Sequence, residues 1–218
     1  MQPYFIPYAG YFRLFVASDL FVIYDCVQFP RRGWVHRNKL LDAAGNAKWI
    51  TLPLVPAPRD VLIQDLQFPP DAAAEFGRRL RRFPPVQTRQ AAEPVLSALY
   101  DIRGTPVDYI EQLLSSIAIY LSLPWTTLRS SQLDIPLSFR GQDRILEIAR
   151  RIGAHDYVNA PSGRVLYDAR RFAKAGIGLN FLTDYPGPTS SILTRILRED
   201  REALIADIRQ SAVSVPAL

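Results

Sequence analysis

The sequence predicts an α/β protein with a mostly parallel, Rossmann-like sheet, flanking helices, a small hairpin and a helical insertion. Residues 1–40 support this class because they read as strand, helix and strand. The run Leu20–Tyr24 is continuously apolar, as in strands buried on both faces. From Trp125 onwards, short strands alternate with helices, which is typical of a parallel sheet. In such sheets ligands bind outside the carboxyl ends of the strands.

The N-terminal segment is predicted to contain two parallel strands joined by a helix. Gln2–Ile6 has the length of a short strand and is closed by Pro7, and the apolar spacing that includes Phe12 and Phe15 is helical. We expect Gln2–Ile6 and Leu20–Tyr24 to be adjacent in one sheet. The residues that follow the two strands would then lie at the same end of it.

A hairpin and several helices are predicted next. Val35–Leu41 and Lys48–Val55 read as two strands joined by a turn at Gly45. We interpret residues 56–124 as a largely helical insertion in a single domain of residues 1–218. Its expected elements are an extended piece between residues 61 and 68, a helix over 71–83 with Asp71 as N-cap, a helix over 91–100, and a helix from Pro106 with Thr105 as N-cap.

The last third is predicted to alternate strands and helices. The expected elements are a strand over residues 125–131, a helix from Gly141 that Gly153 ends, a strand over 156–160, a helix over 166–175, a strand over 178–182 and a final helix from Ser190 to about residue 208. Polar residues or helix starts follow these strands. We therefore expect those residues to share the edge of the sheet at which ligands bind.

The composition limits the class of protein. Of 218 residues, 48% are hydrophobic, which is enough to build a sizeable core. A single cysteine, Cys26, excludes an internal disulfide or a multi-cysteine zinc site, and two histidines argue against a structural metal. No apolar run approaches the roughly 20 residues that cross a bilayer, and no basic region precedes an apolar segment at the N-terminus. We expect a cytoplasmic protein with no membrane span, and the sequence identifies no cofactor.

Arginine supplies most of the positive charge. The net charge is +5, and lysine occurs only at positions 39, 48 and 174. The planar arginine fork suits phosphate and carboxylate, whereas nucleic-acid binding is not expected because the chain has no lysine-rich arm or tail. We therefore expect an anionic small-molecule partner, such as a nucleotide sugar. The arginines of residues 78–82 indicate a solvated helix face or, alternatively, a surface for an acidic partner.

Candidate site residues gather near predicted strand ends and helix starts. Asp25 ends the buried apolar run, where a carboxylate can act as a general base, anchor a ligand or cap the strand. We take Asp25 as the candidate catalytic residue. The amide and cations of residues 37–39 suit a phosphate or carboxylate, although a solvated strand edge has the same composition. The candidate substrate-binding residues are Gln2, Tyr4, Tyr11, Gln28, Arg37, Asn38, Lys39, Ser131, Gln142, Asn159, Gly163 and Tyr167.

Cys26 with His36 as its base is an alternative nucleophilic pair. Free cysteine is more often a small buried hydrophobe, and closeness in sequence does not establish geometry, so this pair is the weaker hypothesis. Ser131 and Gln142 also have structural alternatives, as a turn cap and as a helix start that complements the dipole. For both residues the ligand-binding interpretation depends on their shared position after a strand or at a helix start.

Segments distributed over most of the chain carry a resemblance to a known family. They are QPYFIPYAGYF (2–12), FVIYDCVQF (21–29), GWVHRNKL (33–40), SSQLDI (130–135), GQDRILEIARRIGAHDYVNAPSGRVLYD (141–168) and GIGLNFL (176–182). In order and spacing they are similar to the WbqC-like protein family, and residues 56–124 are the variable part. Family members usually carry a second acidic residue at the place of Cys26 and asparagine at the place of His36. These departures argue against a family-wide catalytic role for either residue.

The resemblance implies a role in bacterial cell-surface glycan biosynthesis of the O-antigen type. We therefore expect a transferase that acts on a nucleotide-activated amino sugar or a carrier-bound acyl group. Two alternatives stay open: a non-catalytic module that binds a nucleotide or nucleotide sugar, and an assembly protein of a glycan pathway. The start of the chain also resembles pantothenate synthetase and its nucleotide-binding relatives. Tyrosines occupy the places of their histidines, so this likeness does not imply adenylyl transfer.

Overall fold

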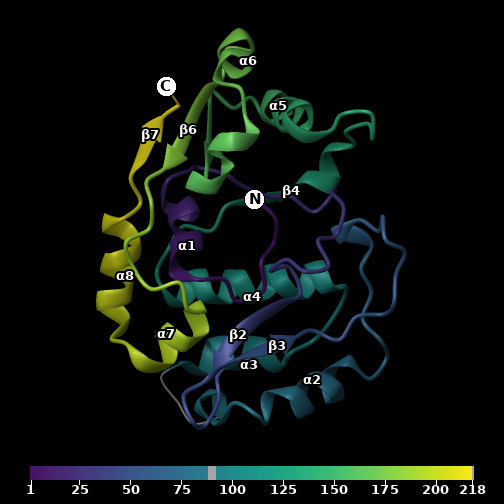
Figure 1. The fold of residues 1–218 in the computed structure, drawn as a ribbon, viewed down its shortest axis with the longest axis vertical. Helices are drawn as coiled ribbons and strands as arrows, with labels where there is room; N and C mark the ends of the chain where they lie inside the picture. The colour runs from purple at the N-terminus through teal and green to yellow at the C-terminus, as the bar shows by residue number, and fades with distance from the viewer. Residues whose placement is uncertain (88–91, 218) are drawn as a thin grey trace.

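The strands of the protein form three small sheets, and helices pack around them (Figure 1). This computed structural model describes residues 1–87 and 92–217. The first sheet is a parallel pair of β1 (Phe21–Ile23) and β4 (Thr127–Arg129), and the second is an antiparallel hairpin of β2 (Arg37–Leu41) and β3 (Ala47–Thr51). In the third sheet, β6 (Gly178–Leu182) is the central strand. It pairs in parallel with β5 (Asp156–Asn159) and antiparallel with β7 (Ser214–Pro216). The predicted α/β class is confirmed, with its parallel pairs in two separate sheets.

Helices cover these sheets and fill the middle of the sequence. They are α1 (Ala9–Val16), α2 (Ala72–Leu80), α3 (Glu93–Tyr100), α4 (Pro106–Tyr120), α5 (Gly141–Arg151), α6 (Ala169–Lys174), α7 (Ile192–Arg198) and α8 (Arg201–Gln210), with short 3₁₀ helices at Ile63–Asp65, Pro84–Gln87, Ser130–Leu133 and Pro161–Leu166. The predicted start of α3 at residue 91 lies outside the described residues. Within residues 1–87 and 92–217, no helix has the length and apolar character needed to cross a membrane.

The predicted strand over Gln2–Ile6 is wrong. Within residues 1–6, only Met1 forms hydrogen bonds with β1 and the residue after it. The Met1 amine donates to the Val22 carbonyl at 2.8 Å, and the Met1 carbonyl accepts from the Tyr24 amide at 2.9 Å. The next residues include two prolines, which lack the N–H that a ladder needs, and Ile6 has a positive φ of 40°. The segment therefore leaves the sheet, and β1 has β4 as its strand partner.

Three other expectations differ from the structure. The final helix is two helices, because the Asp200 side chain accepts a hydrogen bond from the Ala203 amide and caps α8. The helix expected over residues 166–175 is reduced to α6, since a 3₁₀ helix occupies Pro161–Leu166. The extended piece expected between residues 61 and 68 is interrupted by a 3₁₀ helix at Ile63–Asp65, and Leu62 forms one isolated bridge with Gln28. β7 was not predicted.

β1 lies at the junction of two apolar clusters. The larger cluster joins α1 to α4, the hairpin, α7 and α8, and the smaller one joins α5, α6, β5 and β6. Successive β1 side chains point to opposite sides, as in any strand. Phe21 and Ile23 belong to the larger cluster, whereas Val22 and the following Tyr24 pack against the smaller one. The residues that leave β1 therefore emerge between the two clusters.

The long helix α4 shows how local sequence determines an element. Thr105 and Asp108 form a reciprocal capping box: Thr105 Oγ1 accepts from the Asp108 amide at 3.2 Å, and Asp108 Oδ2 accepts from the Thr105 amide at 2.8 Å. Pro106 occupies the first helical position, where its missing N–H costs nothing. One face of α4 is buried in the larger cluster, so a loss of the cap also affects the core.

We predict that Thr105→Ala lowers the free energy of unfolding by about 1 kcal/mol, because an N-cap hydrogen bond is lost. Urea denaturation at constant temperature measures this change. Thr126→Ala removes an exposed hydroxyl and is the matched control, with an expected change within about 0.5 kcal/mol. Equal effects of the two substitutions would contradict the role of the cap.

Candidate functional site

The carboxyl ends of β1 and β4 meet around one buried carboxylate. Asp25 is only 1% exposed. Its Oδ1 accepts hydrogen bonds from Ser130 Oγ and the Ser131 amide, each at 2.9 Å, and its Oδ2 accepts one from Ser131 Oγ at 2.6 Å. Because β1 and β4 are parallel, the residues that follow them emerge side by side, which places Asp25 against the two serines.

A buried arginine completes this group. Arg144, on α5, is 4% exposed, and its Nη1 lies 3.1 Å from the Cys26 sulfur. Ser130 Oγ is also 3.1 Å from that sulfur. The other guanidinium nitrogens donate to backbone carbonyls of the loop at residues 135–139. A buried charge needs such hydrogen bonds, and these attach the loop and α5 to the end of β1.

Three tyrosines and an asparagine border the same strand ends. The Tyr157 and Tyr167 hydroxyls lie 3.2 Å apart, and Asn159 Nδ2 donates to the Tyr167 hydroxyl at 3.3 Å. Burial raises the pKa of Tyr157 well above its ordinary value. Burial also raises the pKa of Tyr24, and the neighbouring Cys26 raises it further. Tyr24 and Tyr157 are therefore neutral phenols at physiological pH and can donate hydrogen bonds.

These residues form what we call the strand-end site. Its members are Tyr24, Asp25, Cys26, Ser130, Ser131, Arg144, Tyr157, Asn159 and Tyr167. They come from the carboxyl ends of β1 and β4, from β5 itself, and from the helical segments that follow β4 and β5. The arrangement combines one carboxylate, two serine hydroxyls, neutral phenols and an amide. Such groups can accept a proton and can bind the hydroxyl groups of a polar ligand.

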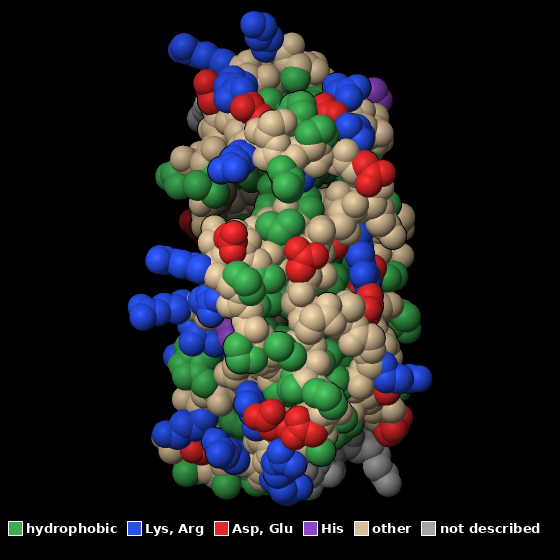
Figure 2. All heavy atoms as spheres, turned by 90° about the vertical axis from the view of Figure 1, so that its right-hand side faces the viewer, with side chains coloured by type: hydrophobic (Ala, Val, Ile, Leu, Met, Phe, Trp, Pro, Cys, Tyr) green, Lys and Arg blue, Asp and Glu red, His purple; other side chains and the backbone are tan. Residues whose placement is uncertain are grey.

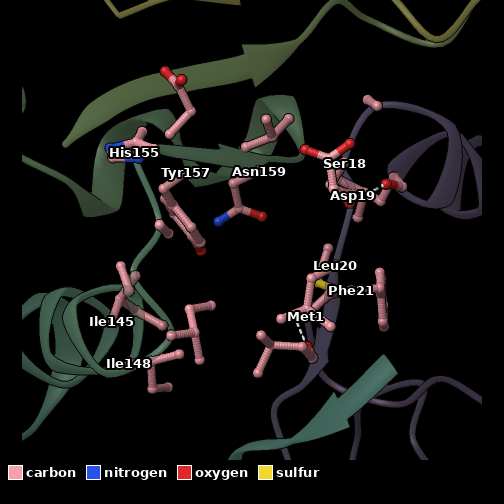
Figure 3. Close-up of a pocket in the computed structure, with 18 of the residues that line it drawn as sticks. Met1, Ser18, Asp19, Leu20, Phe21, Ile145, Ile148, His155, Tyr157 and Asn159 are labelled. Carbon is pink, nitrogen blue, oxygen red and sulfur yellow. Dashed lines mark hydrogen bonds between the residues drawn. The ribbon is translucent and has the colours of Figure 1, made fainter. Parts of the chain in front are cut away.

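A cleft of about 450 Å³ adjoins the strand-end site (Figure 3). Residues 17–22 and Tyr24 line one side, and α5 residues such as Ile145 and Ile148, together with residues 153–159, line the other. In Figure 3, Ser18 and Asp19 lie across the opening from Tyr157 and Asn159. A volume of this size suits a small ligand, which typically occupies roughly 300–1,000 Å³. Tyr24, Tyr157 and Asn159 belong to both the cleft and the strand-end site.

Two further predicted residues lie around Asn159 and α6. The Gln142 amide exchanges hydrogen bonds with the Asp168 backbone, at 2.8 Å to its N–H and 3.4 Å to its carbonyl. Gln142 therefore joins the start of α5 to the start of α6. A Cβ at Gly163 would lie 2.7 Å from Asn159 Nδ2, so glycine allows the 3₁₀ helix after β5 to approach this amide.

Several predicted residues contact the protein's own backbone and rings. The Tyr11 hydroxyl donates to the Gln2 carbonyl at 2.9 Å, and the Tyr4 and Tyr11 rings lie 5.5 Å apart. Asn38 is buried, and its Nδ2 donates to the carbonyls of residues 5 and 6 at 3.0 and 2.8 Å. These contacts hold the N-terminal segment against the hairpin and α1. Gln28 is similarly bonded to a backbone carbonyl, that of residue 59.

The candidate residues that the sequence analysis placed at one edge of a sheet therefore lie in different parts of the structure. The structure brings together Asp25 with Ser131, and Asn159 with Tyr167, at the strand-end site. Arg37 and Lys39 lie on the outer face of the hairpin and are not among the residues that line the cleft. The binding roles of all the candidates stay predictions, but a single cleft does not contain every one of them.

Sequence reasoning missed Tyr24, Arg144 and Tyr157. Tyr24 and Tyr157 were interpreted only as parts of apolar strands, although each has a hydroxyl at or near a strand end. Ser130 shares with Ser131 the position after a predicted strand, which was a usable signal for both serines. Arg144 gave none, because its burial depends on the loop that folds over α5. In the described residues, no cluster of three or more histidine, cysteine, aspartate or glutamate side chains is arranged to hold a metal.

His36 lies elsewhere, beside Phe29, with ring centroids 4.9 Å apart. Its Nδ1 is buried without a hydrogen-bond partner. Burial, with a smaller contribution from the Arg37 charge, lowers the pKa of His36 to about 4. None of the contacts described for His36 involves Cys26, so the structure gives no geometric support to the pair considered above.

Comparisons with known proteins agree with the sequence pattern. The family profile described as "WbqC-like protein family" matches residues 2–189. A protein of Mycobacterium tuberculosis, described as "Uncharacterized protein Rv1507c", is 28% identical over 203 residues, which cover 86% of this chain and 81% of the relative. No solved structure matches this chain.

We predict that the free energy of unfolding falls as the pH is lowered from 6.5 towards 4. The unfolded histidine binds a proton near pH 6.5, whereas folded His36 binds one only near pH 4. Between these values the unfolded state therefore holds more protons, and acid favours it. Chemical denaturation as a function of pH measures the effect. His36→Gln should show a weaker acid dependence than wild type, and His155→Gln, at an exposed position, is the matched control. Identical acid dependence in wild type and His36→Gln would refute the prediction.

Proposed function

This chain belongs to the WbqC-like protein family, and we propose that it is a transferase of bacterial cell-surface glycan biosynthesis. Its donor substrate would be a nucleotide-activated amino sugar or a carrier-bound acyl group. The proposal places donor and acceptor at the strand-end site and in the adjoining cleft. The strand-end site lies at the carboxyl ends of the parallel strands β1 and β4, where α/β proteins bind ligands. The cleft runs beside it along β1 and β5 and is bordered by the residues that precede these two strands.

The observation that carries the proposal is the contact between Asp25 and Ser131. A buried carboxylate holds a half-buried serine hydroxyl at 2.6 Å. Asp25 has no exposed surface to offer a ligand, but Ser131 is accessible and can transmit a proton to it. Proton transfer by a positioned carboxylate typically contributes about 10² to 10⁴ in rate. A strand-end cap would not need the second, partly exposed hydroxyl.

In the proposed reaction, the acceptor amine or hydroxyl attacks the carbonyl carbon of an acyl thioester or the anomeric carbon of a nucleotide sugar. The new bond forms as the thiolate or nucleoside diphosphate leaves with the bonding electron pair. The acceptor loses one proton, which passes to Ser131 Oγ as the Ser131 proton passes to Asp25. Asp25 is the final base in this scheme, and Ser131 is the group that touches the acceptor.

The remaining groups of the strand-end site suit a ligand rich in hydroxyl groups. The neutral phenols of Tyr24 and Tyr157 can donate, and the Asn159 amide can both donate and accept. The apolar α5 side of the cleft would cover the less polar part of the ligand. Arg144 is occupied by backbone carbonyls and by Cys26, so we give it a positioning role rather than a contact with substrate.

A thermal-shift screen against UDP-N-acetylglucosamine, UDP and acetyl-coenzyme A tests the proposal. A ligand at about 100 times its dissociation constant stabilises the folded state by roughly 2.7 kcal/mol. For a chain of this length that corresponds to an increase in melting temperature of about 5 to 10 °C. Ser131→Ala should reduce the increase in melting temperature that the bound ligand causes, measured relative to the same variant without ligand. Ser138→Ala, at an exposed loop position, is the matched control and should retain it.

Absence of a shift with all three probes, or an equal shift in wild type and Ser131→Ala, would overturn the assignment of the site. Asp25→Asn separates binding from chemistry. It keeps an oxygen that can accept the serine hydrogen bonds but removes the base. We expect retained binding and loss of product formation, measured by mass spectrometry of the acceptor.

A non-catalytic nucleotide-sugar binding module is the second candidate. It is favoured by one observation: three hydrogen bonds from the two serines already engage both carboxylate oxygens of Asp25. For this alternative, a bound nucleotide sugar would be recovered unchanged after incubation with acceptors. The assembly-protein alternative would use α2, but Arg79 of this helix already bonds to Glu75 and to the Thr51 carbonyl.

We predict that Cys26→Ser leaves ligand binding and activity within about tenfold of wild type, an effect of roughly 1.4 kcal/mol. A serine oxygen can accept the hydrogen bond that Arg144 now donates to the sulfur. Titration calorimetry with the ligand found in the screen, together with turnover, measures the outcome. A loss of several orders of magnitude in a folded variant would instead assign Cys26 a direct chemical role.

A further inference from the structure

The outer face of the β2–β3 hairpin presents a second group of recognition residues. The hairpin register places Lys39 directly opposite Trp49 and Arg37 one diagonal step away. Trp34, just before β2, lies next to Trp49, with ring centroids 5.4 Å apart and a tilt of 38° between them. We call Trp34, Arg37, Lys39 and Trp49 the hairpin platform.

The platform is held in place by cation–π contacts. The Arg37 guanidinium carbon lies 4.3 Å from the Trp49 ring centroid, and Lys39 Nζ lies 5.1 Å from it. Arg37 also donates to the backbone carbonyls of Arg32 and Gly33, which orients it. Trp34 and Trp49 nevertheless each remain 44% exposed. Large aromatic surface that is both fixed and open is typical of recognition sites rather than of a solvated strand edge.

The charge around the platform is not neutralised by the protein. Figure 2 shows basic and acidic side chains interspersed over one face of the molecule. Many described arginines accordingly form ion pairs, such as Arg129 with Glu111 and Arg195 with Asp207. By contrast, no ion pair in residues 1–87 and 92–217 involves Arg31, Arg32, Arg37 or Lys39. The platform and its flank therefore complement an anionic ligand.

The size of the platform limits the kind of partner. Two strands of five residues extend about 17 Å. A stable protein interface needs about 800 Å² from each partner, far more than two half-exposed indoles provide. Duplex nucleic acid is generally bound through a longer basic stripe along the phosphates. A short saccharide fits, because the C–H face of a sugar ring packs on an indole while its acidic group lies near a cation.

We propose that the hairpin platform binds an acidic saccharide. The sugar rings pack against Trp34 and the open part of Trp49, and the carboxylate or phosphate groups bind Lys39 and Arg32. This site is separate from the strand-end site, because none of its residues lines the cleft. It does not depend on the transferase chemistry proposed above, so the two can fail independently.

The test is titration calorimetry of the full chain with a tetramer of galacturonic acid, with maltotetraose as the neutral counterpart. We expect binding of the acidic tetramer and at least about tenfold weaker binding of the neutral one, about 1.4 kcal/mol. Trp34→Ala and Lys39→Gln should each weaken binding of the acidic tetramer by about tenfold or more. Both positions are exposed, so melting temperatures should stay close to that of wild type.

Two matched controls use exposed residues elsewhere on the protein. Tyr100→Ala removes an equally exposed aromatic from α3, and Lys174→Gln removes a lysine from α6. Both should bind the acidic tetramer like wild type. The proposal is overturned if the acidic tetramer does not bind, or if the controls lose as much affinity as the platform variants. It is also overturned if a single-stranded oligonucleotide of equal charge binds more tightly through Trp34 and Lys39.

Discussion

The hydrogen bonds between Asp25 and the two serines are the constraint on which the architecture depends. β1 and β4 have three residues each, so their ladder alone supplies few hydrogen bonds. Asp25 joins them through Ser130, which is 105 positions away in the sequence, and through the adjacent Ser131. Hydrogen bonds to charged groups typically contribute about 1.5–3 kcal/mol each. The same contact that closes the long segment between the strands also presents a serine hydroxyl for chemistry.

The junction between the two apolar clusters explains why the strand-end site lies where it does. Alternate β1 side chains pack into different clusters, so β1 belongs to both. Arg144 then ties α5 and its preceding loop to Cys26, at the end of this strand. Tyr24, which follows β1, faces the smaller cluster beside Tyr157 and Tyr167. A site at such a junction is bordered by rigid elements from both sides, which favours precise positioning of a ligand.

Elements with a complete local signal could be predicted, and those that depend on distant contacts could not. The hairpin and α4 follow from turn and cap residues that are neighbours in sequence. The segment Gln2–Ile6 has a strand-like composition, but Pro3, the left-handed Ile6 and the following Pro7 direct it away from the sheet. Asp25 and Ser131 could be proposed from their positions at strand ends. The burial of Arg144 could not, because a charged residue on an amphipathic helix normally faces solvent.

The sequence Arg37-Asn38-Lys39 shows why closeness in sequence does not define a site. From the sequence alone, these three residues suggest one cluster of side chains that binds an anion. In β2, side-chain alternation separates its members: Asn38 points inward to the carbonyls of residues 5 and 6, and the two cations point outward to Trp49. The inward residue fixes the segment that leads into α1, and the outward pair forms the hairpin platform. Because β2 supports both at once, a substitution at Asn38 would disturb the N-terminal packing, whereas one at Lys39 changes only the surface.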